Sequence, residues 1–173
     1  MKNIVNDRTS PESGMTVRNK KTSTLLILAT CALASWGLWV MLRPVEIVAV
    51  HKRSSGFSDI LVANFPYTDK GKINWWLRNK NILSKEYNTP KEDSDDYYNI
   101  TFWLFGDSYK EEGKYDRLCF NDMNKKENCI EKNAVLTVSN SKNMGTIFTV
   151  YDGMYQLKEN GEVVKFKNIY EVN

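Results

Sequence analysis

The clearest structural signal in this chain lies in residues 134–166, which read AVLTVSNSKNMGTIFTVYDGMYQLKENGEVVKF. Apolar and polar residues alternate in AVLTVS, TIFTVY, MYQLK and EVVKF, and this alternation is typical of half-buried β-strands. Turn-forming residues separate these segments at Lys142–Gly145, Asp152–Gly153 and Asn160–Gly161. The Asn160–Gly161 pair predicts a type I′ turn, because both residues tolerate a positive φ. The segment therefore predicts an antiparallel β-meander.

Three earlier segments also predict extended structure. Residues 97–105, YYNITFWLF, alternate in the same way and are rich in aromatic side chains. The β-branched residues of Val45–Val50 and Ile60–Val62 favour two short strands. A further extended segment is expected from Tyr115 to Phe120.

One helix is expected between these strands. Thr68 or Asp69 can cap it, and the apolar residues Ile73, Trp76, Leu77, Leu83 and Tyr87 follow at helical spacing to about Glu86. A single helix on one face of an antiparallel sheet is an α+β fold. We therefore expect residues 45–173 to form one α+β domain.

The N-terminal part has a different character. Residues 24–42, TLLILATCALASWGLWVML, contain no formal charge and form a helix long enough to cross the hydrocarbon core of a bilayer. We predict a transmembrane helix here, preceded by a polar cytoplasmic tail, residues 1–23. Two cleaved alternatives remain open: signal cleavage after Ala34, or lipidation at Cys31. The uncleaved anchor is favoured because either cleavage leaves a strongly apolar N-terminus.

Charge and cysteine usage suggest which side of the membrane the domain occupies. Residues 1–44 carry six basic and two acidic residues, so the net charge of +3 belongs to this leader and residues 45–173 are nearly neutral. No nucleic-acid partner is therefore expected. Cys119 and Cys129 can form a disulfide in an oxidising compartment, although two unrelated reduced thiols remain possible. The expected location is the bacterial inner membrane, with the N-terminus in the cytoplasm and the domain in the periplasm.

The sequence gives little support for catalysis. Gly106-Asp107-Ser108 resembles the first motif of GDSL-type esterases, but the later motifs that would supply a base are missing. His51, the only histidine, precedes that motif, and we expect it to be solvated near the membrane. The acidic cluster Glu92–Asp96 lacks the glycine and the final carboxylate of a calcium loop. No metal, no cofactor and no enzymatic activity are therefore predicted.

Three aromatic or apolar residues are candidate contacts for a protein partner. Trp75 diverges by about 100° from Trp76 around the predicted helix, toward the flank that carries Ile82. Trp103 raises the same question on the sheet. The alternative is that a wide core buries these indoles.

Several segments together resemble a known family. LRPVEIVAVH, NFPYTDKGKINWWL, TFWLFGDSYKEEGKYDRLCF and NCIEKN are similar to the enterobacterial putative membrane protein family of unknown function, over residues 24–167. The resemblance implies an inner-membrane protein and supplies no reaction, substrate or catalytic residue.

These observations favour a non-enzymatic periplasmic interaction module, in one form an immunity-type protein that blocks an incoming toxin. Its expected partners are the membrane and one protein. Two alternatives remain: an envelope hydrolase that uses Ser108 or the carboxylates of Asp107 and Asp116, and an envelope assembly accessory.

Overall fold

A computed structural model describes residues 20–41, 43–53, 56–90 and 97–166. Backbone contacts divide the chain into two units, residues 1–42 and residues 43–173, and each is described by itself. Most of the predicted cytoplasmic tail and the acidic cluster Glu92–Asp96 lie outside the described residues.

The first unit contains one helix, α1 (Lys20–Met41). Its segment Thr22–Trp39 is long and apolar enough to cross a membrane, and none of that segment is buried inside the protein. The hydroxyl of Thr30 donates a hydrogen bond to the carbonyl oxygen of Ile27 (2.8 Å), so this polar group has a partner within the helix. Trp36 and Trp39 lie near the C-terminal end with ring centroids 5.8 Å apart.

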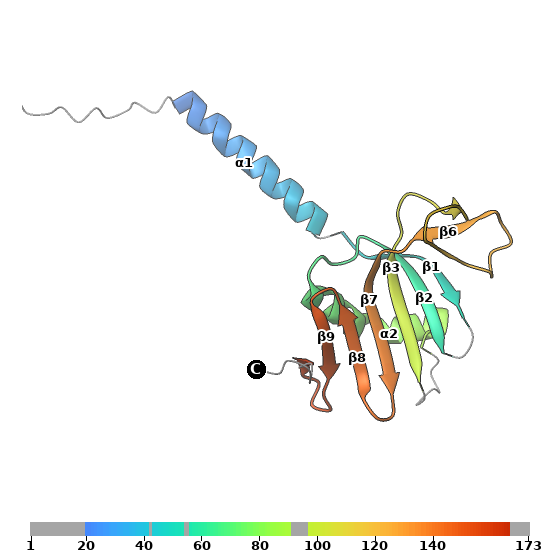
Figure 1. The fold of residues 1–173 in the computed structure, drawn as a ribbon. Coiled ribbons are helices and arrows are strands. Elements are labelled where there is room, and N and C mark those ends of the chain that lie inside the picture. The colour runs from blue at the N-terminus through green and yellow to red at the C-terminus, as the bar shows by residue number, and fades with distance from the viewer. Residues whose placement is uncertain (1–19, 42, 54–55, 91–96, 167–173) are drawn as a thin grey trace, which may run out of the picture. The chain divides into compact units, whose positions relative to one another are not determined.

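The second unit is built on a seven-stranded sheet with the order β1-β2-β3-β7-β8-β9-β10 (Figure 1). The strands span β1 (Glu46–Lys52), β2 (Phe57–Ala63), β3 (Tyr98–Leu104), β7 (Ala134–Ser141), β8 (Gly145–Val150), β9 (Gly153–Leu157) and β10 (Val163–Lys165). The last four strands form the predicted meander, and the α+β class is confirmed. The pair β2 and β3 departs from the antiparallel pattern, because these neighbours run parallel.

Helix α2 (Asp69–Tyr87) connects the two parallel strands and covers one face of the sheet. It begins where predicted, with the side chain of Thr68 accepting a hydrogen bond from the amide of Gly71 (3.1 Å). It ends at Asn88, which adopts the left-handed conformation that often closes a helix. A helical crossover is the usual connection between parallel neighbours, since a tight turn cannot join them.

Side chains from α2 and the sheet form the main core. Phe102 lies at its centre, with ring centroids 5.5 Å from Phe65, 5.8 Å from Trp75 and 5.9 Å from Trp76. Ile100 and Phe102 face α2 while their neighbours face the other side, as the alternation along β3 predicts.

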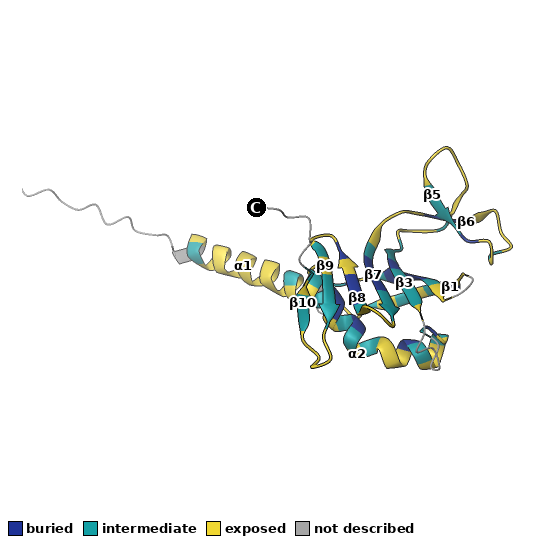
Figure 2. Ribbon diagram, turned by 60° about the horizontal axis from the view of Figure 1, so that its bottom comes forward, coloured by how far each residue is buried: buried dark blue, intermediate teal, exposed yellow. Residues whose placement is uncertain are grey.

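A small second sheet covers part of the opposite face (Figure 2). Its strands are β4 (Lys110–Glu111), β5 (Arg117–Cys119) and β6 (Glu127–Glu131), in the order β4-β6-β5. Phe120 and Ile130 from this region pack with Leu61 of the main sheet in a second core. The small sheet lies over the β1 and β2 side of the main sheet.

One predicted turn differs from the structure. Among the described residues, only Asn64 and Asn88 have a positive φ besides glycines, so Asn160 does not form the type I′ turn. The amide of Lys158 instead donates to the carbonyl of Glu162 (2.8 Å), and Gly161 supplies the positive φ. The β9–β10 loop is therefore longer than the predicted two-residue turn.

The register gives the main sheet two distinct ends. At one end, the start of β1 pairs with the end of β2 (Glu46 with Ala63), and the β8–β9 turn lies at the same end. We call it the tether end, because residues 43–45 lead into β1 there. At the distal end, Lys52 pairs with Ser58 and Phe57 with Asn99. The two ends are separated by the length of a seven-residue strand, about 20 Å.

Candidate interaction site

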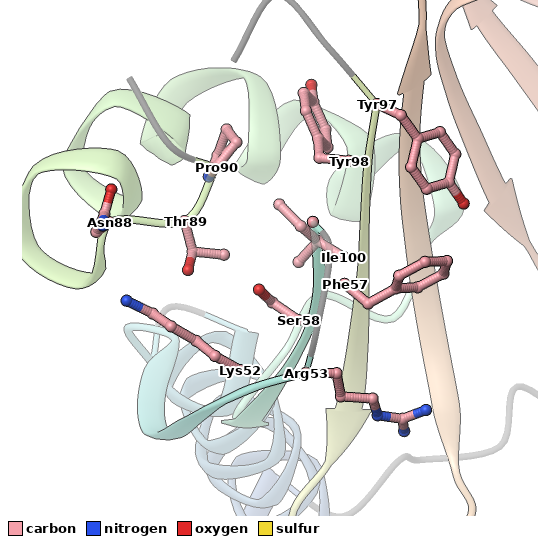
Figure 3. Close-up of a pocket in the computed structure, with 11 residues that line it drawn as sticks. Lys52, Arg53, Phe57, Ser58, Asn88, Thr89, Pro90, Tyr97, Tyr98 and Ile100 are labelled. Atoms are coloured by element: carbon pink, nitrogen blue, oxygen red, sulfur yellow. The ribbon is translucent and has the colours of Figure 1, made fainter. Parts of the chain in front are cut away.

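A cavity of about 340 Å³ opens at the distal end of the sheet. Figure 3 shows the side chains of Lys52, Ser58 and Thr89 on the α2 side of this pocket, together with Ile100. Tyr98 also lines the cavity, and burial raises the pKa of its phenol, an effect partly offset by a hydrogen bond to the side chain of Thr146. The pocket is thus lined by the ammonium group of Lys52, the guanidinium group of Arg53 and several hydroxyl groups.

An aromatic pair at the edge of this pocket, Phe57 and Tyr97, points to the other side of the sheet (Figure 3). Phe57 and Tyr97 are 40% and 46% exposed, and their rings meet edge to face with centroids 5.4 Å apart. This geometry is favourable for two aromatic rings. The pair therefore presents a fixed apolar surface to solvent.

Arg53 points to the same side as the aromatic pair and is held by a buried carboxylate (Figure 3). Its Nε atom lies 2.6 Å from Oδ2 of Asp59, whose side chain is only 5% exposed. The indole N–H of Trp103 donates to Oδ1 of the same carboxylate (2.7 Å). Trp103 thus holds the carboxylate that pairs with Arg53, and Arg53 lines the same pocket as the two aromatic residues. We call Arg53, Phe57 and Tyr97 the distal patch.

The distal patch borders an open part of the main sheet. The small sheet covers only the β1 and β2 side, and among the described residues no layer covers the corresponding face of β7, β8 and β9 (Figure 2). The side chains on this face are those of Thr137, Ser139, Ile147, Thr149, Met154 and Gln156. This face thus combines polar side chains with Met154 and the buried Ile147, and only Thr149 and Met154 are exposed on it.

The three residues predicted as partner contacts do not come together. Trp75 is half-buried, with its ring centroid 5.2 Å from Phe65, so it belongs to the main core. Ile82 lies on α2 and is 49% exposed. Trp103 lies on the opposite face of the sheet, half-buried against the second core. Their part in partner binding stays a prediction, and the sequence reasoning missed the distal patch.

His51 is not solvated, contrary to the sequence-based expectation. Its side chain is 7% exposed and stacks on Phe120, with ring centroids 3.8 Å apart. Nδ1 lies 2.9 Å from Oδ2 of Asp122, and Nε2 lies 3.0 Å from the hydroxyl of Tyr109. These partners are distant from His51 in the sequence. The prediction of a polar environment, which was based on the neighbouring Lys52 and Arg53, was therefore wrong. The cluster joins β1 to the loops that flank the small sheet.

Asp122, His51 and Tyr109 are connected in the order carboxylate, imidazole, hydroxyl, as in a catalytic triad. Here, however, the hydroxyl group is the phenol of Tyr109 and not that of a nucleophilic serine. Burial and the charge of Asp122 both raise the pKa of Tyr109, which disfavours the phenolate. The arrangement therefore suits a structural connection better than nucleophilic chemistry.

Ser108 lies in a different cavity, of about 530 Å³, at the tether end. The hydroxyl is exposed, and the same cavity is lined by Asp107, Lys110 and Glu131. The ammonium of Lys110 donates to a carboxylate oxygen of Glu131 (2.8 Å). This hydrogen bond is the main cause that lowers the pKa of the exposed Glu131, and a hydrogen bond from Arg117 and the charges of both cations lower it further. Ser108 has no histidine beside it among the residues that line this cavity.

The two cysteines of the domain lie directly opposite each other in β5 and β6. The structure joins their sulfur atoms in a disulfide. Cys31 lies exposed on α1. Among the described residues, no group of three or more His, Cys, Asp or Glu side chains is placed to hold a metal ion.

Comparisons with known proteins give one match. A search of curated proteins and a search of solved structures each found none. A family model described as "Enterobacterial putative membrane protein (DUF943)" matches residues 16–167, which include α1 and every described strand. The apolar helix that no part of the protein buries agrees with that description. With nearly the whole chain matched, this protein belongs to that enterobacterial membrane protein family, whose function is unknown.

Proposed function

We propose that this protein is a non-enzymatic interaction module tethered to the inner membrane by α1, with its C-terminal domain in the periplasm. The membrane association follows from the family and the candidate span. The disulfide-distance cysteine pair supports an oxidising compartment. In one form of this proposal the domain is an immunity-type protein, and its partner is a toxin that reaches the periplasm.

The observation that carries the proposal is the distal patch. Arginine and large aromatic residues dominate the energetics of protein interfaces when they are held in place before binding. Here Asp59 orients Arg53 at 2.6 Å, and Phe57 and Tyr97 support each other at 5.4 Å. The partner expected at such a patch is a protein that presents an apolar side chain next to an acidic one.

A hydrolase that uses Ser108 is the alternative. A serine nucleophile needs a base, and both ring nitrogens of His51 already have partners in Asp122 and Tyr109. Lys110, which shares the cavity with Ser108, is paired with Glu131. These contacts favour the interaction module. Replacing Ser108 with Gly separates the two functions, since only the hydrolase should lose activity.

Photocrosslinking in living cells tests the proposal directly. The full-length chain would carry a benzoylphenylalanine in place of Tyr97, and adducts formed under ultraviolet light would be identified by mass spectrometry. We expect one adduct of defined mass, which the change Phe57→Ser abolishes. The purified partner should then bind the Arg53→Glu variant at least ten times more weakly than the wild type, a loss of about 1.4 kcal/mol.

Met144 provides a matched control. It is 48% exposed and lies in the β7–β8 turn at the same end of the sheet, but it does not line the pocket. The change Met144→Ser should leave the adduct and the affinity unchanged. An adduct that survives Phe57→Ser and Arg53→Glu unchanged would contradict the role of the distal patch.

A further inference from the structure

The longest free edge among the described strands belongs to β1. The seven residues of β1 pair only with β2, whereas β10, at the other edge of the main sheet, has three residues. The outer strands of the small sheet have two and three residues. A free edge presents N–H and C=O groups with which another strand can pair. β1 is therefore the strand that offers the most backbone groups to another chain.

The register identifies the residues of β1 whose backbone groups point away from β2. The amide of Arg53 donates to the carbonyl of Phe57 (2.9 Å), so Arg53 faces β2. Successive residues of an antiparallel pair alternate in this respect. His51 therefore also faces β2, and Val50 and Lys52 face outward. In the described part of the chain, the amides of Val50 and Lys52 have no hydrogen-bond partner.

A bulge limits the length of this edge. The register of β1 shifts between Ile47 and Ala49, so the ladder is regular only from Ala49 to the end of the strand at Lys52. Val50 packs on the main core and Ala49 on the second core, and each is only half-buried. A strand placed along this edge would therefore bury apolar surface on both faces of the sheet.

The edge of β1 continues into the distal patch. Arg53, the first residue after β1, belongs to that patch, and so does Phe57, the first residue of β2. A standard protein interface buries about 800 Å² on each partner, which is more than three partly exposed side chains provide. The open face of the sheet adds little, since only Thr149 and Met154 are exposed on it. The edge of β1 adds both apolar surface and unpaired backbone groups.

We infer that the protein bound at the distal patch adds an extended strand to β1 along Ala49–Lys52. This inference rests on the proposed function and states how the partner binds. In strand addition, backbone hydrogen bonds supply affinity and alternate side chains supply specificity. The expected partner segment is a run of about four mostly apolar residues, because successive side chains lie over Val50 on one face and Ala49 on the other.

A second copy of this chain is a poorer occupant of the edge. The antiparallel register that uses the outward groups of both Val50 and Lys52 would bring two Lys52 side chains within about 8 Å of each other, and like charges on paired strands are destabilising. The carboxylates of Asp59 and Asp122 are already engaged with Arg53 and His51. The partner is therefore a different protein, whose segment places no cation opposite Lys52.

Hydrogen exchange measures the added strand directly. The complex is the covalent adduct that the full-length chain with benzoylphenylalanine at position 97 forms in cells, purified in detergent micelles. In the free chain, the amides of Val50 and Lys52 should exchange quickly and those of Ala49 and His51 slowly, because only the latter bond to β2. In the adduct, we expect exchange at Val50 and Lys52 to slow by about tenfold or more, with little change at Ala49 and His51.

The variant Val50→Pro tests the same edge by a second route. It removes one outward N–H and leaves the bonds to β2 in place, and proline is tolerated on an edge strand where the N–H faces solvent. We expect the yield of adduct from position 97 to fall by about tenfold. Val50→Ala, which keeps the N–H, is the matched control and should retain the adduct. Urea unfolding reports whether each variant is folded.

The possible outcomes separate the inference from the proposed function. An adduct in which Val50 and Lys52 exchange as fast as in the free chain would overturn the strand addition and leave the distal patch intact. A folded Val50→Pro variant that keeps the adduct would do the same, and if that variant does not fold, the exchange comparison decides. An adduct of twice the mass of the chain would identify a second copy and overturn the inference. The absence of any adduct at position 97 would overturn the proposed function, and the strand addition with it.

Discussion

His51 shows how one side chain can join two parts of a domain. Its ring is buried against Phe120 and bonded to Asp122 and Tyr109. We expect His51→Ala to lower the free energy of unfolding by about 2–3 kcal/mol, because the change removes a buried ring and leaves two polar groups without their partner. Denaturant unfolding of the full chain in detergent micelles measures this loss. Lys52→Ala, at an exposed neighbour, should cost less than about 0.5 kcal/mol, and an equal cost for both variants would refute the role of His51.

Tyr109 gives the domain a specific weakness at high pH. Its pKa is raised in the folded state, first by burial and second by the charge of Asp122. The folded protein thus holds the phenolic proton more tightly than the unfolded chain. The contribution of this proton to the free energy of unfolding is fully present below the ordinary tyrosine pKa of about 10. It is lost as the pH rises through the higher pKa of Tyr109 in the folded protein. Denaturation midpoints from neutral pH to about 11 should fall less steeply for Tyr109→Phe than for the wild type. Equal slopes would show that Tyr109 does not contribute to alkaline unfolding.

The residues of the candidate site could not be predicted from sequence for a clear reason. Arg53 and Phe57 looked like ordinary turn residues, and their importance comes from Asp59, Tyr97 and Trp103, which the fold brings to them. His51 and Asp122 are separated by 71 positions. Local patterns carry no information about such distant partners.

At the scale of secondary structure, local signals predicted most elements. The Thr68 cap and the spacing of Ile73, Trp76 and Leu83 predicted α2, and the alternation after Ala134 predicted the meander. Strand β6 was missed because it has only five residues, most of them polar or charged. The parallel pairing of β2 with β3 was missed because a crossover connection leaves no short-range signature.

The small sheet should depend on its cysteine pair. Replacing both Cys119 and Cys129 with serine opens a loop of about ten residues, and the expected loss is about 2–3 kcal/mol in the free energy of unfolding. Adding dithiothreitol to the wild type should lower its stability to that of the double variant, as followed by urea unfolding. Cys31→Ser is the control and should have no effect. A wild type that reductant does not destabilise would mean that the bond makes no contribution.

For the whole molecule, the compartment of the domain is the central prediction. In a Cys31→Ser background, a membrane-impermeant maleimide should label neither Cys119 nor Cys129 in intact cells unless reductant is added first. After reduction, labelling should occur without lysis, because the domain is expected outside the cytoplasm. Labelling that needs lysis but no reductant would place the domain in the cytoplasm and contradict the proposed orientation.

The central position of β3 has a consequence for synthesis. Its neighbours are β2 on one side and β7 on the other, and residues 105–133 lie between β3 and β7. A ribosome makes the chain from its N-terminus, so β3 emerges well before the strand that completes its pairing. During that interval the nascent chain exposes an unpaired strand edge together with the apolar side chains around Phe102, and such edges promote aggregation. A holding chaperone is therefore expected to bind the chain until β7 (Ala134–Ser141) has become free to pair with β3.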